Sequence, residues 1–216
     1  MKKVLLLLSA VLLFALTSFA DTTINNFSGY NDYWHPFGDP RGDTQTYGEV
    51  FTVPDNVQKL LNFSFYMGNP IDSGQIITGA YIATWTGTHA GFLLYDSGEF
   101  DYDNLGNEKI TFSPTNLYVN SGQQYVMFLS TSKYSGQSFG STYVASGNAD
   151  PNLNGFAYFN NGNAFNSLFE DSWDGSGLSP DWAVELNFDN TPEPNSLMLL
   201  GSGLLAVIPI VRRKLI

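Results

Sequence analysis

The chain has 216 residues, with 20 acidic and nine basic side chains and no cysteine. If residues 1–20 and 195–216 are set aside as targeting segments, the other 174 residues hold every acidic side chain but only four basic ones, a formal charge of −16. Such a charge repels phosphate backbones and excludes nucleic acid as a partner. The lack of cysteine excludes disulfides, thiolate zinc sites and thiol catalysis. The remaining length suits one domain with a single core.

The N-terminus predicts export. Two lysines precede an apolar run at residues 4–16, and small side chains follow at Ser18 and Ala20. This order is typical of a secretory signal peptide, cleaved by signal peptidase between Ala20 and Asp21. The alternative is a retained membrane anchor, but the run is short for a membrane span. We therefore expect residues 1–20 to be removed.

The central region predicts an all-β fold. Its segments alternate or run apolar in short bursts between Gly, Asn, Asp and Pro turns, and no amphipathic helix is evident. In the clearest case, Leu61, Phe63 and Phe65 are expected on one face of a strand and Asn62, Ser64 and Tyr66 on the other. We expect an antiparallel β-sandwich or jelly roll over residues 21–190. The expected strands are 46–53, 58–67, 75–85, 91–95, 108–112, 123–131, 141–145, 155–159 and 182–188.

One acidic stretch is a weak catalytic candidate. Glu99, Asp101 and Asp103 occupy alternate positions, so a strand would place them on one face, about 6.5–7 Å apart. The stretch faintly resembles the Glu-x-Asp-x-Glu site of laminarinase-like glycoside hydrolases, with Asp103 replacing the second glutamate. The resemblance implies an acid/base and a nucleophile. The alternative is a solvated acidic edge that discourages strand pairing.

A weak calcium candidate follows. Asp150, Asn152 and Asn154, with Gly155, fit the first six positions of a calcium loop. Asn161 stands where a bidentate glutamate is needed, so the loop would supply only one negative charge. Residues 171–175 form a second acidic loop. No cofactor is expected, although calcium remains a possibility at such loops.

Aromatic side chains beside Asn and Asp suit carbohydrate, because sugars present apolar faces between hydroxyls. Most aromatic side chains of a sandwich belong to its core, as we expect for Trp85 and Trp182. Trp34 and Trp173 lie in loop-like contexts instead. We predict that these two are partly exposed and bind a ligand.

The C-terminal region combines three features in order. Pro192-Glu193-Pro194 precedes an apolar stretch at 197–211, and the basic cluster Arg212-Arg213-Lys214 follows. Fifteen residues at 1.5 Å rise are only marginally enough to cross a bilayer. The basic cluster predicts a cytoplasmic end and an exported domain. We expect a single transmembrane helix at about 196–211.

Residues 191–216 resemble the PEP-CTERM sorting domain of Gram-negative bacteria, although Thr191 stands where valine is frequent. The resemblance implies recognition by an exosortase (a membrane transpeptidase-like enzyme), removal of the tail after transient anchoring in the inner membrane, and delivery to the cell surface or an exopolysaccharide matrix. The alternative is an ordinary membrane tether. Stretches such as 47–54 and 124–130 also resemble an uncharacterised domain of other PEP-CTERM proteins, which supports a β-sandwich.

These features predict an exported, non-enzymatic surface or matrix protein. Besides signal peptidase and an exosortase, its expected partners are extracellular polysaccharide or neighbouring surface proteins. One alternative is a secreted glycan-active hydrolase that uses Glu99 with Asp101 or Asp103. The other is a structural matrix protein that depends on calcium.

Overall fold

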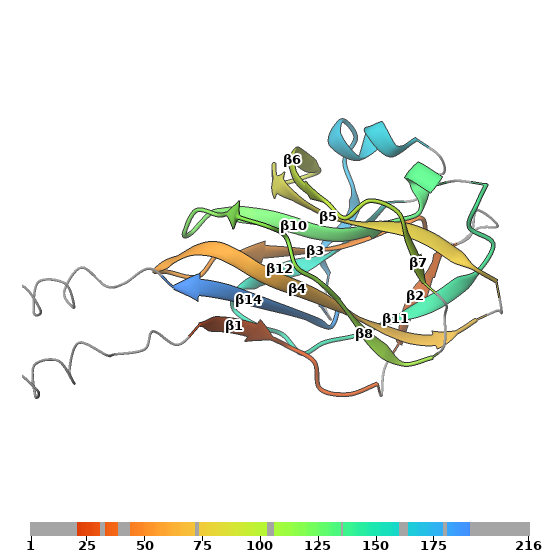
Figure 1. Cartoon of the computed structure of the whole chain (residues 1–216), viewed down its shortest axis with the longest axis horizontal. Helices are drawn as coiled ribbons and strands as arrows, with labels where there is room; N and C mark the ends of the chain where they lie inside the picture. Colours follow the sequence, from red (N-terminus) through yellow and green to blue (C-terminus); the bar gives the residue numbers. More distant parts are fainter. Residues whose placement is uncertain are drawn as a thin grey trace, which may run out of the picture. The chain divides into compact units, whose positions relative to one another are not determined.

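The computed structural model describes residues 21–30, 33–38, 44–71, 74–102, 106–134, 136–159, 164–178 and 181–190. The predicted signal peptide, the predicted sorting segment and the predicted transmembrane helix lie outside these residues. The described part forms two stacked antiparallel sheets and two 3-10 turns, with no α-helix in these ranges (Figure 1). The expected all-β architecture is confirmed.

Sheet A runs in the order β1-β14-β4-β11-β2, and the short strands β8 and β9 pair with the other edge of the long β4. Thr22 of β1 lies opposite Phe188 of β14, so the two ends of the sandwich leave from one strand pair. The strands of sheet A are β1 (Thr22–Asn25), β2 (Tyr33–Gly38), β4 (Val57–Pro70), β8 (Glu108–Phe112), β9 (Leu117–Tyr118), β11 (Ser141–Ala145) and β14 (Val184–Asn190).

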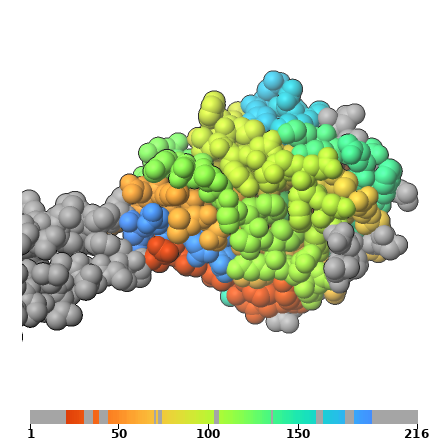
Figure 2. Space-filling view, in the orientation of Figure 1, coloured from red at the N-terminus to blue at the C-terminus, as the bar shows by residue number. Residues whose placement is uncertain are grey.

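Sheet B runs in the order β13-β12-β3-β10-β5-β6, with β7 also paired to β5. Figure 2 shows one side of the sandwich, whose centre is formed by the yellow to green segments that include β6, β7 and β8. The strands of sheet B are β3 (Thr46–Thr52), β5 (Ile76–Trp85), β6 (Ala90–Asp96), β7 (Phe100–Tyr102), β10 (Gln124–Ser130), β12 (Leu153–Phe159) and β13 (Asp174–Leu178).

All nine expected strands are present, with small differences at their ends. The pattern did not predict β1, β2, β7, β9 and β13, most of which are short. In β4, Phe63 and Phe65 are buried as expected, but Leu60 is fully buried while Leu61 is only partly so. The strand therefore changes phase near its start, where its partner changes from β9 to β8.

The main core lies between the sheets and is rich in aromatic rings. Trp182, just before β14, stacks on Phe65 of β4 with ring centroids 4.4 Å apart. Its indole N–H donates to the Tyr66 carbonyl at 3.3 Å, which satisfies the polar atom of a side chain that is 1% exposed. Burial of such rings stabilises the fold both by area and by ring geometry.

A second apolar cluster lies on the outer face of sheet B. The 3-10 turn η2 (Phe165–Phe169) and the segment leading to β13 cover this face, as Figure 1 shows above β5 and β6. Trp173 packs edge-on against Phe128 at 5.3 Å and Trp85 at 5.7 Å. An added Cβ at Gly48 would lie 3.0 Å from the Trp173 ring, so the glycine allows the indole to approach β3. The middle strands of sheet B are thus buried on both faces.

Candidate functional site

The outer face of sheet A is polar, in contrast to that of sheet B. Because side chains alternate along a strand, the outward positions of neighbouring strands form one continuous surface. On β1, β14, β4 and β8 these positions carry amides, hydroxyls, one tyrosine and one ion pair. We call this surface the amide face, and its members are Thr23, Asn25, Asn62, Ser64, Tyr66, Lys109, Thr111, Glu185 and Asn187. Ser64 and Tyr66 are buried, whereas the other members are exposed or partly exposed.

Glu185 is the centre of the amide face. Its Oε1 accepts hydrogen bonds from Lys109 at 2.6 Å and Asn187 at 3.0 Å. Its Oε2 accepts from Asn25 at 2.8 Å and from the Tyr66 hydroxyl at 3.3 Å. These donors come from four different strands, so the carboxylate links β1, β4, β8 and β14.

The network continues along the sheet. The Asn187 amide donates to Asn62 Oδ1 at 2.7 Å, and Asn187 Oδ1 accepts from the Thr23 hydroxyl at 2.6 Å. Further along, the hydroxyls of Ser64 and Thr111 are 2.9 Å apart. The side chains of the amide face are therefore held in fixed orientations by one another.

The electrostatics of this face follow from its contacts. Burial alone would raise the pKa of Glu185, but the hydrogen bonds from Lys109 and Asn187 outweigh it and lower the pKa below its usual value. Burial, followed by the Glu185 charge, raises the pKa of Tyr66. At neutral pH, Glu185 is thus charged and Tyr66 is neutral.

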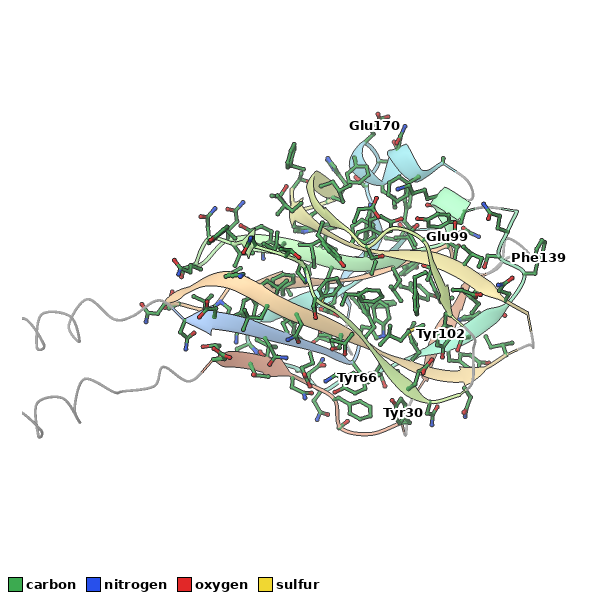
Figure 3. All side chains as sticks on the ribbon, viewed as in Figure 1. Tyr30, Tyr66, Glu99, Tyr102, Phe139 and Glu170 are labelled. Atoms are coloured by element: carbon green, nitrogen blue, oxygen red, sulfur yellow. The ribbon has the colours of Figure 1, made fainter. Side chains whose placement is uncertain are left out.

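Two further rings border the amide face. Phe27 stacks on Tyr66 with centroids 3.9 Å apart, and Tyr30 packs edge-on against Phe27 at 4.8 Å. Both rings are partly exposed. The Phe27 backbone N–H donates to Asn25 Oδ1 at 3.0 Å, which fixes the chain as it leaves β1. Figure 3 shows Tyr30 and Tyr66 together near β1, well away from Glu99.

The structure places the acidic stretch at the edge of sheet B. Strand β7 spans only Phe100–Tyr102, so of the three candidate carboxylates only Asp101 lies in a strand. Asp101 is exposed and accepts a hydrogen bond from Gln75, while Glu99 is exposed just before the strand. Asp103 lies outside the described residues. A catalytic role of these residues stays the untested alternative to the predicted non-enzymatic protein.

At the candidate calcium loop, two of the three proposed ligand side chains already accept hydrogen bonds from other groups of the protein. Asp150 Oδ1 accepts from the backbone N–H of Asn152 at 2.8 Å, and Asn154 Oδ1 accepts from the Thr52 hydroxyl at 2.5 Å. Within the described ranges, no group of three or more His, Cys, Asp or Glu side chains could hold a metal ion. These contacts do not test whether calcium binds at Asp150, Asn152 and Asn154, and the expectation of no cofactor stays a prediction.

The expectation that Trp173 is partly exposed is wrong. The side chain is 5% exposed, and its indole N–H donates to the Leu168 carbonyl at 2.9 Å. The surrounding loop is acidic and polar, but Trp173 itself points into the second apolar cluster, because the loop folds back over sheet B. Trp34 lies in β2, and its side chain falls outside those that the structure describes.

Sequence reasoning missed a buried acid. Glu49 of β3 is fully buried, and its Oε2 accepts from the Trp182 backbone N–H at 2.8 Å. Its Oε1 has no hydrogen-bond partner among the described residues. Burial, followed by the nearby Asp181 carboxyl, raises the pKa of Glu49 well above its usual value, and the backbone N–H groups of Trp182 and Gly155 offset this only in part. Burial also raises the pKa of Asp181.

The amide face was missed as well, although a signal for it exists. Glu185, Asn187 and Asp189 alternate with three apolar residues in β14, just as Asn62, Ser64 and Tyr66 do in β4. Alternation shows that each set shares a face of its strand. It does not show that β4 and β14 are neighbours. The two sets form one surface only because these strands lie side by side.

Comparison with known proteins identifies the C-terminal segment. Residues 190–214 match the PEP-CTERM protein-sorting motif. The chain is therefore a PEP-CTERM protein, as its Pro192-Glu193-Pro194 and basic cluster predicted, and the motif implies export, processing by an exosortase and sorting to the cell surface. In the described part of the chain, no helix is long and apolar enough to cross a membrane.

The sandwich is also similar to two solved structures at low identity. The crystal structure of the cysteine protease and lectin-like domains of Cwp84, a surface layer associated protein of Clostridium difficile, shares 9% identity at a TM-score of 0.49, over 81% of this chain and 37% of that chain. A clostridial Cwp84 cysteine protease after propeptide cleavage shares 9% identity at a TM-score of 0.48, over 79% and 40%. The chain thus spans well under half of either structure, and no curated protein matches it.

Proposed function

We propose that the chain is a non-enzymatic protein of the cell surface or extracellular matrix of a Gram-negative bacterium, associated with exopolysaccharide. The sorting motif at residues 190–214 carries this proposal. It begins at the last residue of β14, whose partner β1 begins two residues after the predicted signal cleavage at Ala20. The two predicted processing sites thus flank the same strand pair of the sandwich.

The membrane part of the proposal is that a helix at about 196–211 anchors the chain transiently in the inner membrane, until an exosortase removes it. Replacement of Pro192-Glu193-Pro194 by three alanines tests this in the host. We expect the variant to keep its tail and to stay in the membrane fraction. Thr191→Val is the matched control, and we expect it to be processed like the wild type. Unchanged processing and location of the triple variant would mean that the tail is only a tether.

The matrix part is tested by retention of the exported protein on the host's own exopolysaccharide, with and without calcium. We expect retention in both conditions, because amide, hydroxyl and aromatic groups are the surface chemistry that suits carbohydrate. Trp34 remains a proposed contact, and Trp34→Ala is expected to weaken retention. No retention in either condition would contradict the proposed association with polysaccharide and would leave surface proteins as the proposed partners.

A glycan hydrolase that uses Glu99 with Asp101 or Asp103 is the competing class of function. The exported protein is therefore assayed for release of reducing ends from the same exopolysaccharide. We expect none. Release that disappears in Glu99→Gln or Asp103→Asn would replace the non-enzymatic proposal with the hydrolase.

A further inference from the structure

The two outer faces of the sandwich differ in a way that points to a ligand. The outer face of sheet B is apolar, and the chain covers it with its own residues, among them Leu168 and Trp173. The amide face of sheet A carries only polar groups and Tyr66, and these groups bond mainly to one another. One face therefore completes the fold, and the other presents an ordered polar surface.

Resting on the proposed association with polysaccharide, we propose that the amide face is the surface that binds it, and that the ligand is a neutral, hydroxyl-rich glycan chain. Sugar hydroxyls both donate and accept hydrogen bonds, and so do the amides of Asn25, Asn62 and Asn187 and the hydroxyls of Thr23 and Thr111. Of these residues, Thr23, Asn25 and Thr111 are exposed. They could therefore contact a chain laid across β1, β14, β4 and β8.

The existing hydrogen bonds favour binding because they hold the side chains in place before a ligand arrives. Asn187 is fixed by three partners, the side chains of Glu185, Asn62 and Thr23. Side chains that are already ordered lose little rotamer freedom on binding, and the loss of that freedom otherwise opposes association. A merely solvated sheet face would lack this order.

The charge of the amide face selects the class of glycan. Its members Lys109 and Glu185 form an ion pair 2.6 Å long, and Asp189, the next outward position of β14, adds one negative charge at the end of the face. The rest of the folded part is strongly acidic and repels polyanions at longer range. A neutral glycan chain is not subject to this repulsion. Phe27 and Tyr30 add partly exposed rings at one border, where the apolar face of a sugar can pack.

The test uses the exported protein and the host exopolysaccharide, separated by anion exchange into a neutral and an acidic fraction. The two face variants are Asn25→Ala, which removes an exposed amide, and Thr111→Arg, which places a bulky charge on the face. Thr88→Arg is the matched control, because it adds the same charge at an exposed turn of sheet B. Unfolding midpoints of all variants are measured first, to show that each is folded.

We expect the wild type and Thr88→Arg to bind the neutral fraction equally, with little effect of salt. Thr111→Arg and Asn25→Ala should each weaken binding by about tenfold, as expected when one or two hydrogen bonds are lost. Equal binding by all four proteins would overturn the assignment of the face and leave the proposed function standing. Salt-sensitive binding of the acidic fraction alone would overturn the ligand class. Failure of the wild type to bind either fraction would overturn the proposed association itself.

Discussion

The backbone N–H of Trp182 donates a 2.8 Å hydrogen bond to Oε2 of Glu49. This bond joins β3, in the middle of sheet B, to the segment that enters β14 of sheet A. A buried, charged carboxylate is costly when one of its oxygens accepts no hydrogen bond. A protonated carboxyl can still accept the hydrogen bond from Trp182 and carries no charge. Burial thus favours the protonated form of Glu49, although the hydrogen bond from Trp182 by itself favours the ionised form.

Stability is therefore expected to fall as pH rises. The folded pKa of Glu49 lies above the unfolded value, so the folded chain binds its proton more tightly. The resulting stability is complete below the unfolded pKa and is lost as pH rises through the folded one, with a slope of at most about 1.4 kcal/mol per pH unit for one proton. Glu49→Gln should remove this slope, as measured by denaturant unfolding across the neutral range. Identical slopes in both proteins would show that Glu49 is ionised in the folded state.

Trp173→Ala is expected to destabilise the protein by about 3–5 kcal/mol, as for other buried tryptophans. The indole packs against three rings, those of Trp85, Phe128 and Phe159, and closes the second apolar cluster. Guanidinium midpoints give the comparison. Phe92→Ala is the control, because Phe92 is 75% exposed and its loss should change stability by no more than about 0.5 kcal/mol. Similar midpoints for the two variants would contradict the buried position of Trp173.

Lys109→Met is expected to raise the pKa of Glu185 toward its usual value, since the hydrogen bond and charge of Lys109 lower it. The pair is partly exposed, so the loss of stability at neutral pH should be within about 1 kcal/mol. Because the Glu185 contribution is present above the unfolded pKa and lost as pH falls, the variant should differ less from the wild type in acid. A carbon-detected NMR titration of Glu185 measures the shift, with Lys133→Met as the control that leaves Glu185 untouched. A titration that Lys109→Met leaves unchanged would argue against the ion pair.

Calcium is expected to leave the thermal midpoint of the exported protein unchanged. Asp150 Oδ1 and Asn154 Oδ1 already accept hydrogen bonds within the protein, so a cation would have to displace them. A ligand that binds only the folded state would raise the midpoint as its concentration rises. The check is a calorimetric scan with calcium and with chelator. A calcium-dependent rise that Asp150→Asn abolishes would establish a site at this loop.

Much of the fold was predictable because its signal is local. In β14, Val184, Leu186 and Phe188 are buried while the residues between them face outward, as strict alternation requires. The same rule fails in β3, where every residue from Thr46 to Phe51 is buried. A strand covered on both faces shows no alternation, and its polar residues give no sign of whether they face a partner or solvent.

The sorting motif, the β-rich class and most of the strands can be predicted from local sequence patterns, because each depends on residues close together in the chain. The folded structure was needed to show that Trp173 is covered, that Glu49 meets Trp182 inside the core, and that Asn62 and Asn187 share one face. Each of these depends on which strands become neighbours and on what covers them. Pairing in this sandwich joins residues more than a hundred positions apart, such as Asn25 and Glu185, which local patterns cannot specify.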